Sequence, residues 1–180
     1  AIDLPNYGDS EWSTQNLSIA DYATIVQATL AKLEVTSYSL YGVHGGASVA
    51  LDLAARYPEE VQSLILSGVP LFTDEERAKL HAGLKPLQFI EDGSHYQIWW
   101  ESFRQKWAST TPAEIIESAV VDIMKAGSSY DVGYRAAFDY NPLQALEKVN
   151  QPIYLPVAVN DPLVLKNEQV LSMKIHVSEE

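Results

Sequence analysis

The spacing of apolar residues divides the first 70 positions of the chain into alternating helices and strands. From Ser18 to residue 33, apolar side chains recur every three or four positions, which predicts a helix that starts at Ser18. Residues 35–43 and 61–70 are rich in β-branched, aromatic and aliphatic side chains and predict two buried strands. Between them, the alanines and leucines of 47–57 predict a helix that can lie close to a sheet. This order with short connections is typical of a parallel sheet covered by helices.

The pattern changes after these elements, where a series of helices without strands is predicted. Residues 73–143 contain capping signals, an aromatic helical stripe and a proline suited to the first turn of a helix. A strand signal returns at 151–164, although Pro156 within it cannot donate a hydrogen bond to a sheet. We therefore predict an α/β core formed by 1–72 and 144–180, with a helical insertion between the two parts.

Composition is that of an ordinary globular protein and excludes several classes of function. The chain is 47% hydrophobic and 20% charged, with a formal net charge of −12. That charge argues against nucleic acid or an anionic membrane as a partner. The absence of cysteine excludes disulfide, thiolate and zinc–cysteine chemistry. No apolar run approaches the roughly 18 residues that span a bilayer, and no signal peptide is visible, so we expect a cytoplasmic protein.

The motif Gly42-Val43-His44-Gly45-Gly46 joins a predicted strand to the predicted alanine-rich helix. A strand that turns directly into a helix holds its middle residue on a tight, strained bend, and flanking glycines relieve the crowding there. The N–H groups at the start of the helix face any negative charge that develops near the bend. The motif therefore predicts a reactive position at His44.

The stretch "LYGVHGGASVALDLAARYPEEVQSLILSGVP" resembles the nucleophile elbow of the α/β-hydrolase superfamily, together with the helix and strand that follow it. Residues 1–11 are similar to its strand-four segment, and 151–164 to the strand that carries its acid. The insertion at 73–143 matches its cap domain in position. The resemblance implies a mostly parallel sheet flanked by helices, with a helical cap and no cofactor. The first strands of the superfamily would precede residue 1, so we expect an incomplete α/β-hydrolase fold.

The resemblance also implies roles for individual residues. His44 occupies the position of the nucleophile, which is normally serine, cysteine or aspartate. The Gly45 N–H would donate to an oxyanion, and Asp161 occupies the position of the triad acid. His176 is the candidate for the catalytic histidine, although it lacks the usual preceding glycine and follows Asp161 too closely for the usual helix and strand.

Alternatives stay open for both central residues. Imidazole titrates near neutral pH, so His44 suits a general base. It could also attack an acyl or phosphoryl centre as a covalent nucleophile, or occupy the elbow without any chemistry. Asp161 could orient a histidine, or it could form an ordinary turn before Pro162.

The predicted substrate contacts are Val43, His95 and Trp99. His95 could line a pocket under the cap or be satisfied by its local backbone, and Trp99 could touch substrate or form the core of the cap. Ser48 lies one turn into the helix after the elbow, so we expect it to pack there. We expect His81 to be a solvated helix residue. No spacing typical of a metal site or a nucleotide-binding loop is present, so we expect neither metal nor nucleotide.

Two functions of different classes fit these observations. The first is hydrolase-like or lyase-like action on a small, largely apolar ester or lactone, with His44 as the central group. The second is a catalytically inactive homologue that binds a small ligand or acts as an interaction protein, because the fold alone does not decide activity. The expected partner is a small-molecule substrate or ligand. The sequence does not determine the oligomeric state.

Overall fold

The structure, a computed structural model, describes residues 1–85, 87–156 and 161–174. The chain forms two compact units. The sheet unit consists of Leu17–Ala82 and Gly133–Glu180, and the helical unit consists of Ala1–Asn16 and Gly83–Val132. The predicted division of the chain at residues 72 and 143 stays a prediction.

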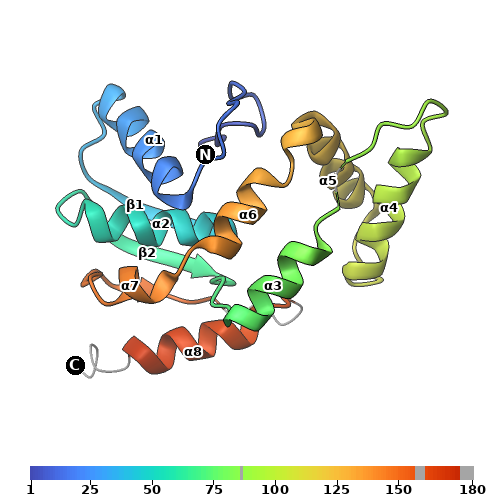
Figure 1. Cartoon of the computed structure of the whole chain (residues 1–180). Helices are drawn as coiled ribbons and strands as arrows, with labels where there is room; N and C mark the ends of the chain where they lie inside the picture. Colours follow the sequence, from blue (N-terminus) through green and yellow to red (C-terminus); the bar gives the residue numbers. More distant parts are fainter. Residues whose placement is uncertain (86, 157–160, 175–180) are drawn as a thin grey trace. The chain divides into compact units, whose positions relative to one another are not determined.

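A small parallel sheet in the order β1-β2-β3 forms the centre of the sheet unit (Figure 1). Its strands are β1 (Tyr38–Val43), β2 (Val61–Ser67) and β3 (Ile153–Tyr154). The strands predicted at 35–43 and 61–70 are confirmed, with later starts or earlier ends than the composition suggests. Because parallel strands end at the same edge, the carboxyl ends of all three strands meet on one side of the sheet.

The ends of the second and third strands have local causes. β2 stops at Ser67 because Gly68 has a φ of 62°, a left-handed conformation that leaves the extended region. β3 pairs over two residues and ends before Pro156, so the proline removes no hydrogen bond from the sheet. Part of the third predicted strand, 157–160, lies outside the described residues.

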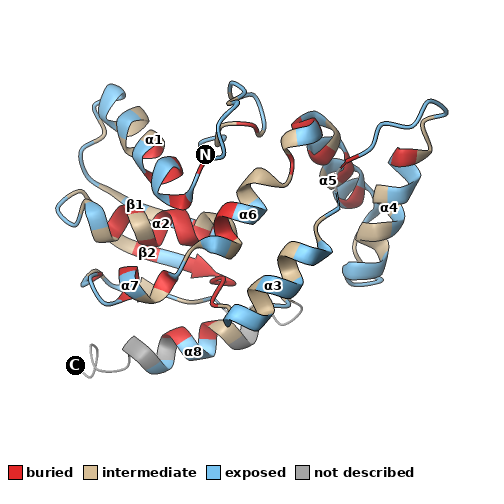
Figure 2. Ribbon diagram, viewed as in Figure 1, coloured by how far each residue is buried: buried red, intermediate tan, exposed pale blue. Residues whose placement is uncertain are grey.

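Helix α2 (Gly45–Arg56) packs on the sheet and connects it to other helices. It contacts β1 and β2, and also α1 (Ile19–Lys32) and α7 (Pro142–Leu146). The small alanines of α2 permit this close packing, as predicted. Figure 2 shows buried positions along α2 and at the end of β2. Four leucines in these two elements are fully buried: Leu51, Leu53, Leu64 and Leu66.

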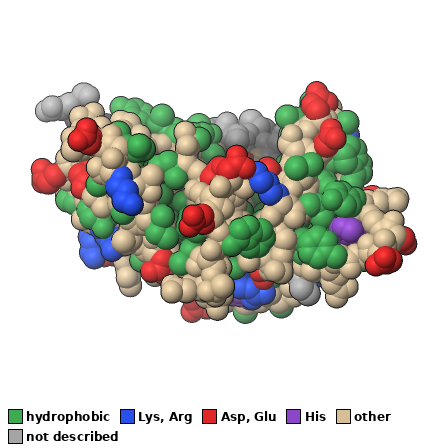
Figure 3. Space-filling model, turned by 90° about the horizontal axis from the view of Figure 1, so that it is seen from above, with side chains coloured by type: hydrophobic (Ala, Val, Ile, Leu, Met, Phe, Trp, Pro, Cys, Tyr) green, Lys and Arg blue, Asp and Glu red, His purple; other side chains and the backbone are tan. Residues whose placement is uncertain are grey.

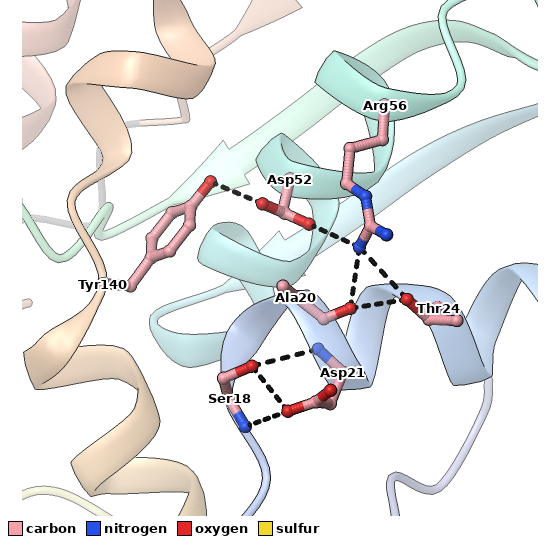
Figure 4. Close-up of polar contacts among 7 residues, drawn as sticks. All are labelled: Ser18, Ala20, Asp21, Thr24, Asp52, Arg56 and Tyr140. Carbon is pink, nitrogen blue, oxygen red and sulfur yellow. Dashed lines mark hydrogen bonds and ion pairs between the residues drawn. The ribbon is translucent and has the colours of Figure 1, made fainter.

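Polar side chains hold α1, α2 and the segment after α6 together on the surface of the sheet unit (Figure 4). Arg56 Nη1 donates to the carbonyl oxygen of Ala20 at 2.8 Å and to Asp52 Oδ2 at 3.3 Å. Tyr140 Oη donates to the other oxygen of Asp52, Oδ1, at 3.3 Å. Burial, together with the nearby Asp52 carboxylate, raises the pKa of Tyr140, so the phenol stays protonated and donates.

The helical unit contains α4 (Ser94–Lys106), α5 (Ala113–Ala126) and the short turn η1 (Gly127–Ser129). One buried cluster in this unit contains Leu87, Ile123, Ala126 and Tyr130, against which Tyr7, Trp99, Phe103 and Met124 pack. Trp99 and Phe103 of the predicted aromatic stripe therefore pack against this cluster. Residues 1–4 form no strand in the structure, in contrast to the strand-four segment that they resemble.

Helices α3 (Asp74–Gly83), α6 (Val132–Asp139) and α8 (Val164–Lys174) complete the structure. His81 lies in α3 with a side chain that is 29% exposed, and its Nε2 lies 2.7 Å from Asp139 Oδ1, so this partly solvated ring also links α3 to α6. Lys166 of α8 contacts the Glu76 carboxylate of α3 at 2.9 Å, which ties these two helices together.

Acidic side chains do not gather into one patch on the face drawn in Figure 3. Figure 3 shows acidic side chains at separate places on one face, with hydrophobic side chains between them. None of the helices in the described ranges has the length and apolar character that crossing a bilayer requires.

The start of α1 offers a test of the local sequence signals. Ser18 Oγ accepts from the Asp21 N–H at 3.2 Å, and Asp21 Oδ2 accepts from the Ser18 N–H at 2.8 Å, which completes a capping box. Ser18→Ala should lower the free energy of unfolding by about 1 kcal/mol. Thermal denaturation measures this, with Ser172→Ala as a matched control because Ser172 is an exposed helical serine of the same unit. Equal melting temperatures for the two variants would contradict the assignment.

The same cap gives a pH dependence. Hydrogen bonds from Ser18 hold the pKa of Asp21 below its ordinary value of 3.8. Because the folded pKa is the lower one, this stabilisation is present above pH 3.8 and is lost as the pH falls through the folded value. The stability difference between wild type and Ser18→Ala should therefore shrink below that pH. A difference that stays constant there would contradict it.

Candidate active site

The turn between β1 and α2 holds His44 in a strained backbone conformation. His44 has φ 49° and ψ −115°, and positive φ is uncommon for a residue other than glycine. Such strain costs about 1–3 kcal/mol and persists where the surroundings enforce it. Two backbone hydrogen bonds do so here: the His44 N–H donates to the Ser67 carbonyl at 2.9 Å, and its own carbonyl accepts from the Ala47 N–H at 2.9 Å. The predicted sharp bend is therefore present.

Gly42 is required because the start of α2 passes directly over the end of β1. A β-carbon at Gly42 would lie 2.4 Å from the carbonyl oxygen of Gly46 and 2.7 Å from the amide nitrogen of Ala47. Both neighbours are backbone atoms that are fixed by the helix. By contrast, a β-carbon at Gly46 would meet nothing within 4 Å. The two outer glycines of the motif thus serve different purposes.

The side chain of His44 reaches Asp161 across the end of the sheet. His44 Nε2 lies 3.0 Å from Oδ1 and 2.9 Å from Oδ2 of Asp161. The His44 side chain is 46% exposed and that of Asp161 is 10% exposed. Asp161 Oδ1 also accepts from the Leu163 N–H at 2.8 Å, so the carboxylate is held in place by its own turn. Asp161 thus contacts the His44 ring and is also bonded within its own turn, and its role as the acid that orients a catalytic histidine stays a prediction.

This pairing determines how the neutral ring can act. A carboxylate offers only acceptors, so the neutral imidazole bonds to it with the proton on Nε2. Nδ1 then carries the free lone pair, and it has no hydrogen-bond partner among the described residues. A histidine in this state, with an aspartate behind it, has the relation that a general base has to its orienting acid.

The amino end of α2 lies beside the same position. Gly45 is the first residue of α2 and directly follows His44. In the described part of the chain, the Gly45 N–H donates to no backbone carbonyl outside its helix. Such an N–H, at the positive end of a helix, is suited to stabilise developing negative charge. Val43 precedes the bend and is 43% exposed. The roles of Gly45 as oxyanion donor and of Val43 as substrate contact stay predictions.

Three further predicted site residues lie outside the described part of the sheet unit. His95 and Trp99 belong to the helical unit, where His95 is buried and its Nδ1 accepts from the Ile90 N–H at 3.1 Å. The Trp99 ring packs edge-on against Tyr130 with centroids 5.1 Å apart. These contacts match the structural alternatives for both residues. Their proposed substrate contacts stay predictions, and His176 lies outside the described residues.

Two buried polar side chains, Ser48 and Asn167, lie in the sheet unit. Ser48 is fully buried, and its Oγ has no partner in the described structure, so it packs beneath the elbow as expected. Asn167 of α8, which is 3% exposed, was not predicted from the sequence. Its Oδ1 accepts from the Val69 N–H at 3.2 Å, and its Nδ2 donates to the Pro156 carbonyl at 3.3 Å. It thus links the segments that follow β2 and β3, and nothing in the sequence around it signals this link.

Metal binding finds no support in the part of the chain that the structure describes. No three histidine, aspartate or glutamate side chains there gather closely enough to hold an ion.

Comparison with known proteins identifies the fold. No family model matches the chain, and no curated protein matches it significantly. An esterase from Exiguobacterium antarcticum superposes with a TM-score of 0.73 at 19% identity, over 94% of this chain and 66% of the esterase. An enzyme that degrades N-acyl homoserine lactones superposes with a TM-score of 0.68 at 20% identity, over 96% of this chain and 68% of its own. An α/β-hydrolase enzyme from a Medee basin deep-sea metagenome library gives 0.60 at 16% identity, over 93% and 65%.

This chain therefore has an α/β-hydrolase fold, and the predicted fold class and resemblance are confirmed at the level of the fold. It spans 66% of the length of the first structures that it matches.

The crowding at the elbow can be tested with two glycine substitutions. Gly42→Ala should destabilise the protein by about 1–3 kcal/mol, because its methyl group meets backbone that cannot move aside. Gly46→Ala should be neutral or stabilising by up to about 1 kcal/mol, because it replaces a helical glycine where space is free. Chemical denaturation of both variants measures the difference. If Gly42→Ala were as stable as Gly46→Ala, α2 would not lie against the end of β1 as described.

Proposed function

We propose that this chain carries out hydrolase-like chemistry on a small, largely apolar ester or lactone, with His44 as a general base. The observation that carries the proposal is the contact of 2.9 Å between His44 Nε2 and Asp161 Oδ2 at a strained strand–helix turn. The solved structures of the same fold include an esterase and an enzyme that degrades N-acyl homoserine lactones, and these two substrate classes support the choice of ester or lactone.

In the proposed reaction, His44 Nδ1 accepts a proton from a water molecule as the water oxygen bonds to the substrate carbonyl carbon. The carbonyl oxygen becomes an oxyanion that the Gly45 N–H stabilises. Asp161 keeps the ring oriented and stabilises the imidazolium that forms. When the carbon–oxygen bond of the ester or lactone breaks, the imidazolium returns the proton to the leaving oxygen. The products are an acid and an alcohol, or a hydroxy acid from a lactone.

General base catalysis is favoured over a covalent acyl-imidazole for a steric reason. With Nε2 engaged by Asp161, the free nitrogen is Nδ1, which lies next to the ring carbon that bears Cβ. A proton can reach a nitrogen flanked in this way, whereas an acyl carbon with its substituents is hindered. The exposure of the ring, 46% for the side chain, leaves room for a water molecule in front of it.

The remaining expectations about this protein belong to the same proposal. A small molecule is the proposed partner, without nucleic acid or membrane, in keeping with the net charge of −12. Action without cofactor or metal and a cytoplasmic location also stay predictions.

Replacement of His44 tests the function directly. With p-nitrophenyl esters and a panel of lactones, His44→Ala should lower kcat by about 10²–10⁴-fold, because the general base is lost. His81→Ala is the matched control, because His81 is also paired with an aspartate, but that pair joins α3 to α6 away from the elbow turn. The kcat of this variant should equal that of the wild type.

Equal turnover by His44→Ala and the wild type would overturn the proposal. Thermal stabilisation by esters or lactones without any turnover would instead support the inactive, ligand-binding homologue.

A further inference from the structure

Gly68, the first residue after β2, lies directly against the His44–Asp161 pair. A β-carbon at this position would lie 2.4 Å from Cδ2 and 2.8 Å from Nε2 of the His44 ring. It would also lie 2.7 Å from Asp161 Oδ2. All three distances are shorter than van der Waals contact, so the pair occupies the space that any side chain at Gly68 would need.

The backbone around Gly68 is held on both sides and cannot withdraw from the pair. On one side, the Ser67 carbonyl accepts the His44 N–H at 2.9 Å. On the other, the Val69 N–H donates to the buried Asn167 side chain at 3.2 Å, and Val69 itself is fully buried. Side chains turn more readily than a backbone fixed in this way. A methyl group at Gly68 would therefore displace the His44 ring.

We propose that Gly68 is a positioning residue for the proposed reaction: its missing side chain defines the place where the His44 ring meets the Asp161 carboxylate. Asp161 keeps its hydrogen bond from Leu163 in any case, so the ring is the partner that moves. In a displaced ring, Asp161 no longer fixes the proton on Nε2, and the Nδ1 lone pair no longer points toward the reacting water. The turnover part of the test depends on the proposed function, whereas the contact between the two side chains does not.

The first measurement is independent of turnover. In ¹⁵N-labelled protein, the imidazole N–H proton of His44 should be shifted downfield and protected from exchange by its bond to the carboxylate. Asp161→Asn identifies that signal, because it removes the charged acceptor. Gly68→Ala should abolish the signal or move it to the position of a solvated imidazole. An unchanged signal in Gly68→Ala would overturn the proposal, even if the protein turns out to have no activity.

The matched control is Gly93→Ala in the helical unit. Gly93 also has a positive φ, 78°, but a β-carbon there would meet nothing within 4 Å. Both substitutions therefore impose similar backbone strain, and only one of them meets the pair. Gly93→Ala should lose some thermal stability and keep the His44 signal. Loss of the signal in both variants would show that general strain, rather than contact with the pair, is the cause.

Turnover gives the second measurement. Gly68→Ala should lower kcat by about 10²-fold, the scale expected for a displacement of about 1 Å in a catalytic group, with little change in KM. Because Gly68 and Asp161 act on the same ring, Gly68→Ala combined with Asp161→Asn should be no slower than the slower single variant. Fully multiplied losses in the double variant would contradict a shared action.

A third measurement applies if Gly68→Ala folds poorly. It compares the effect of Gly68→Ala on stability with and without the His44 ring. If the clash with His44 causes the defect, removing the ring should relieve it. In a His44→Ala background, Gly68→Ala should therefore lower the melting temperature less than it does in the wild type. An equal loss in both backgrounds would assign the effect to the backbone of Gly68 and overturn the proposal.

Discussion

The strained bend at His44 is the constraint on which the rest of the sheet unit depends. It ends β1 and starts α2 within one residue, which places the amino end of the helix at the carboxyl edge of the sheet. The bend is possible because Gly42 allows α2 to pass close to the strand. The same geometry turns the imidazole toward Asp161, a residue far away in the sequence. Backbone strain, helix placement and side-chain pairing are therefore consequences of one local conformation.

One hydrogen bond from its own turn holds the Asp161 carboxylate, and a separate side chain ties neighbouring segments together. That turn supplies the N–H of Leu163, and Asn167 ties the segment after β3 to the segment after β2. An acid that orients a histidine needs such support, because a mobile carboxylate would not determine which ring nitrogen carries the proton.

Much of the fold could be predicted from the sequence because its signals are local. The cap at Ser18, the alanines of α2 and the apolar strands each determine their own element. The meeting of His44 and Asp161 could be expected from resemblance alone, because it depends on how strands are paired and not on any local pattern. Gly68 and Asn167 were missed for the same reason: a glycine that makes room for two distant side chains reads in sequence as an ordinary turn residue. The contact between His81 and Asp139 was not predicted, because the two residues belong to different helices.

The central claim is that the His44 ring, oriented by Asp161, transfers a proton from water. Its most direct test is the single-turnover hydrolysis rate of a p-nitrophenyl ester measured in H₂O and in D₂O. The account predicts a slower rate in D₂O, because the bond to the transferred proton breaks as the water attacks. Equal rates in the two solvents would contradict it.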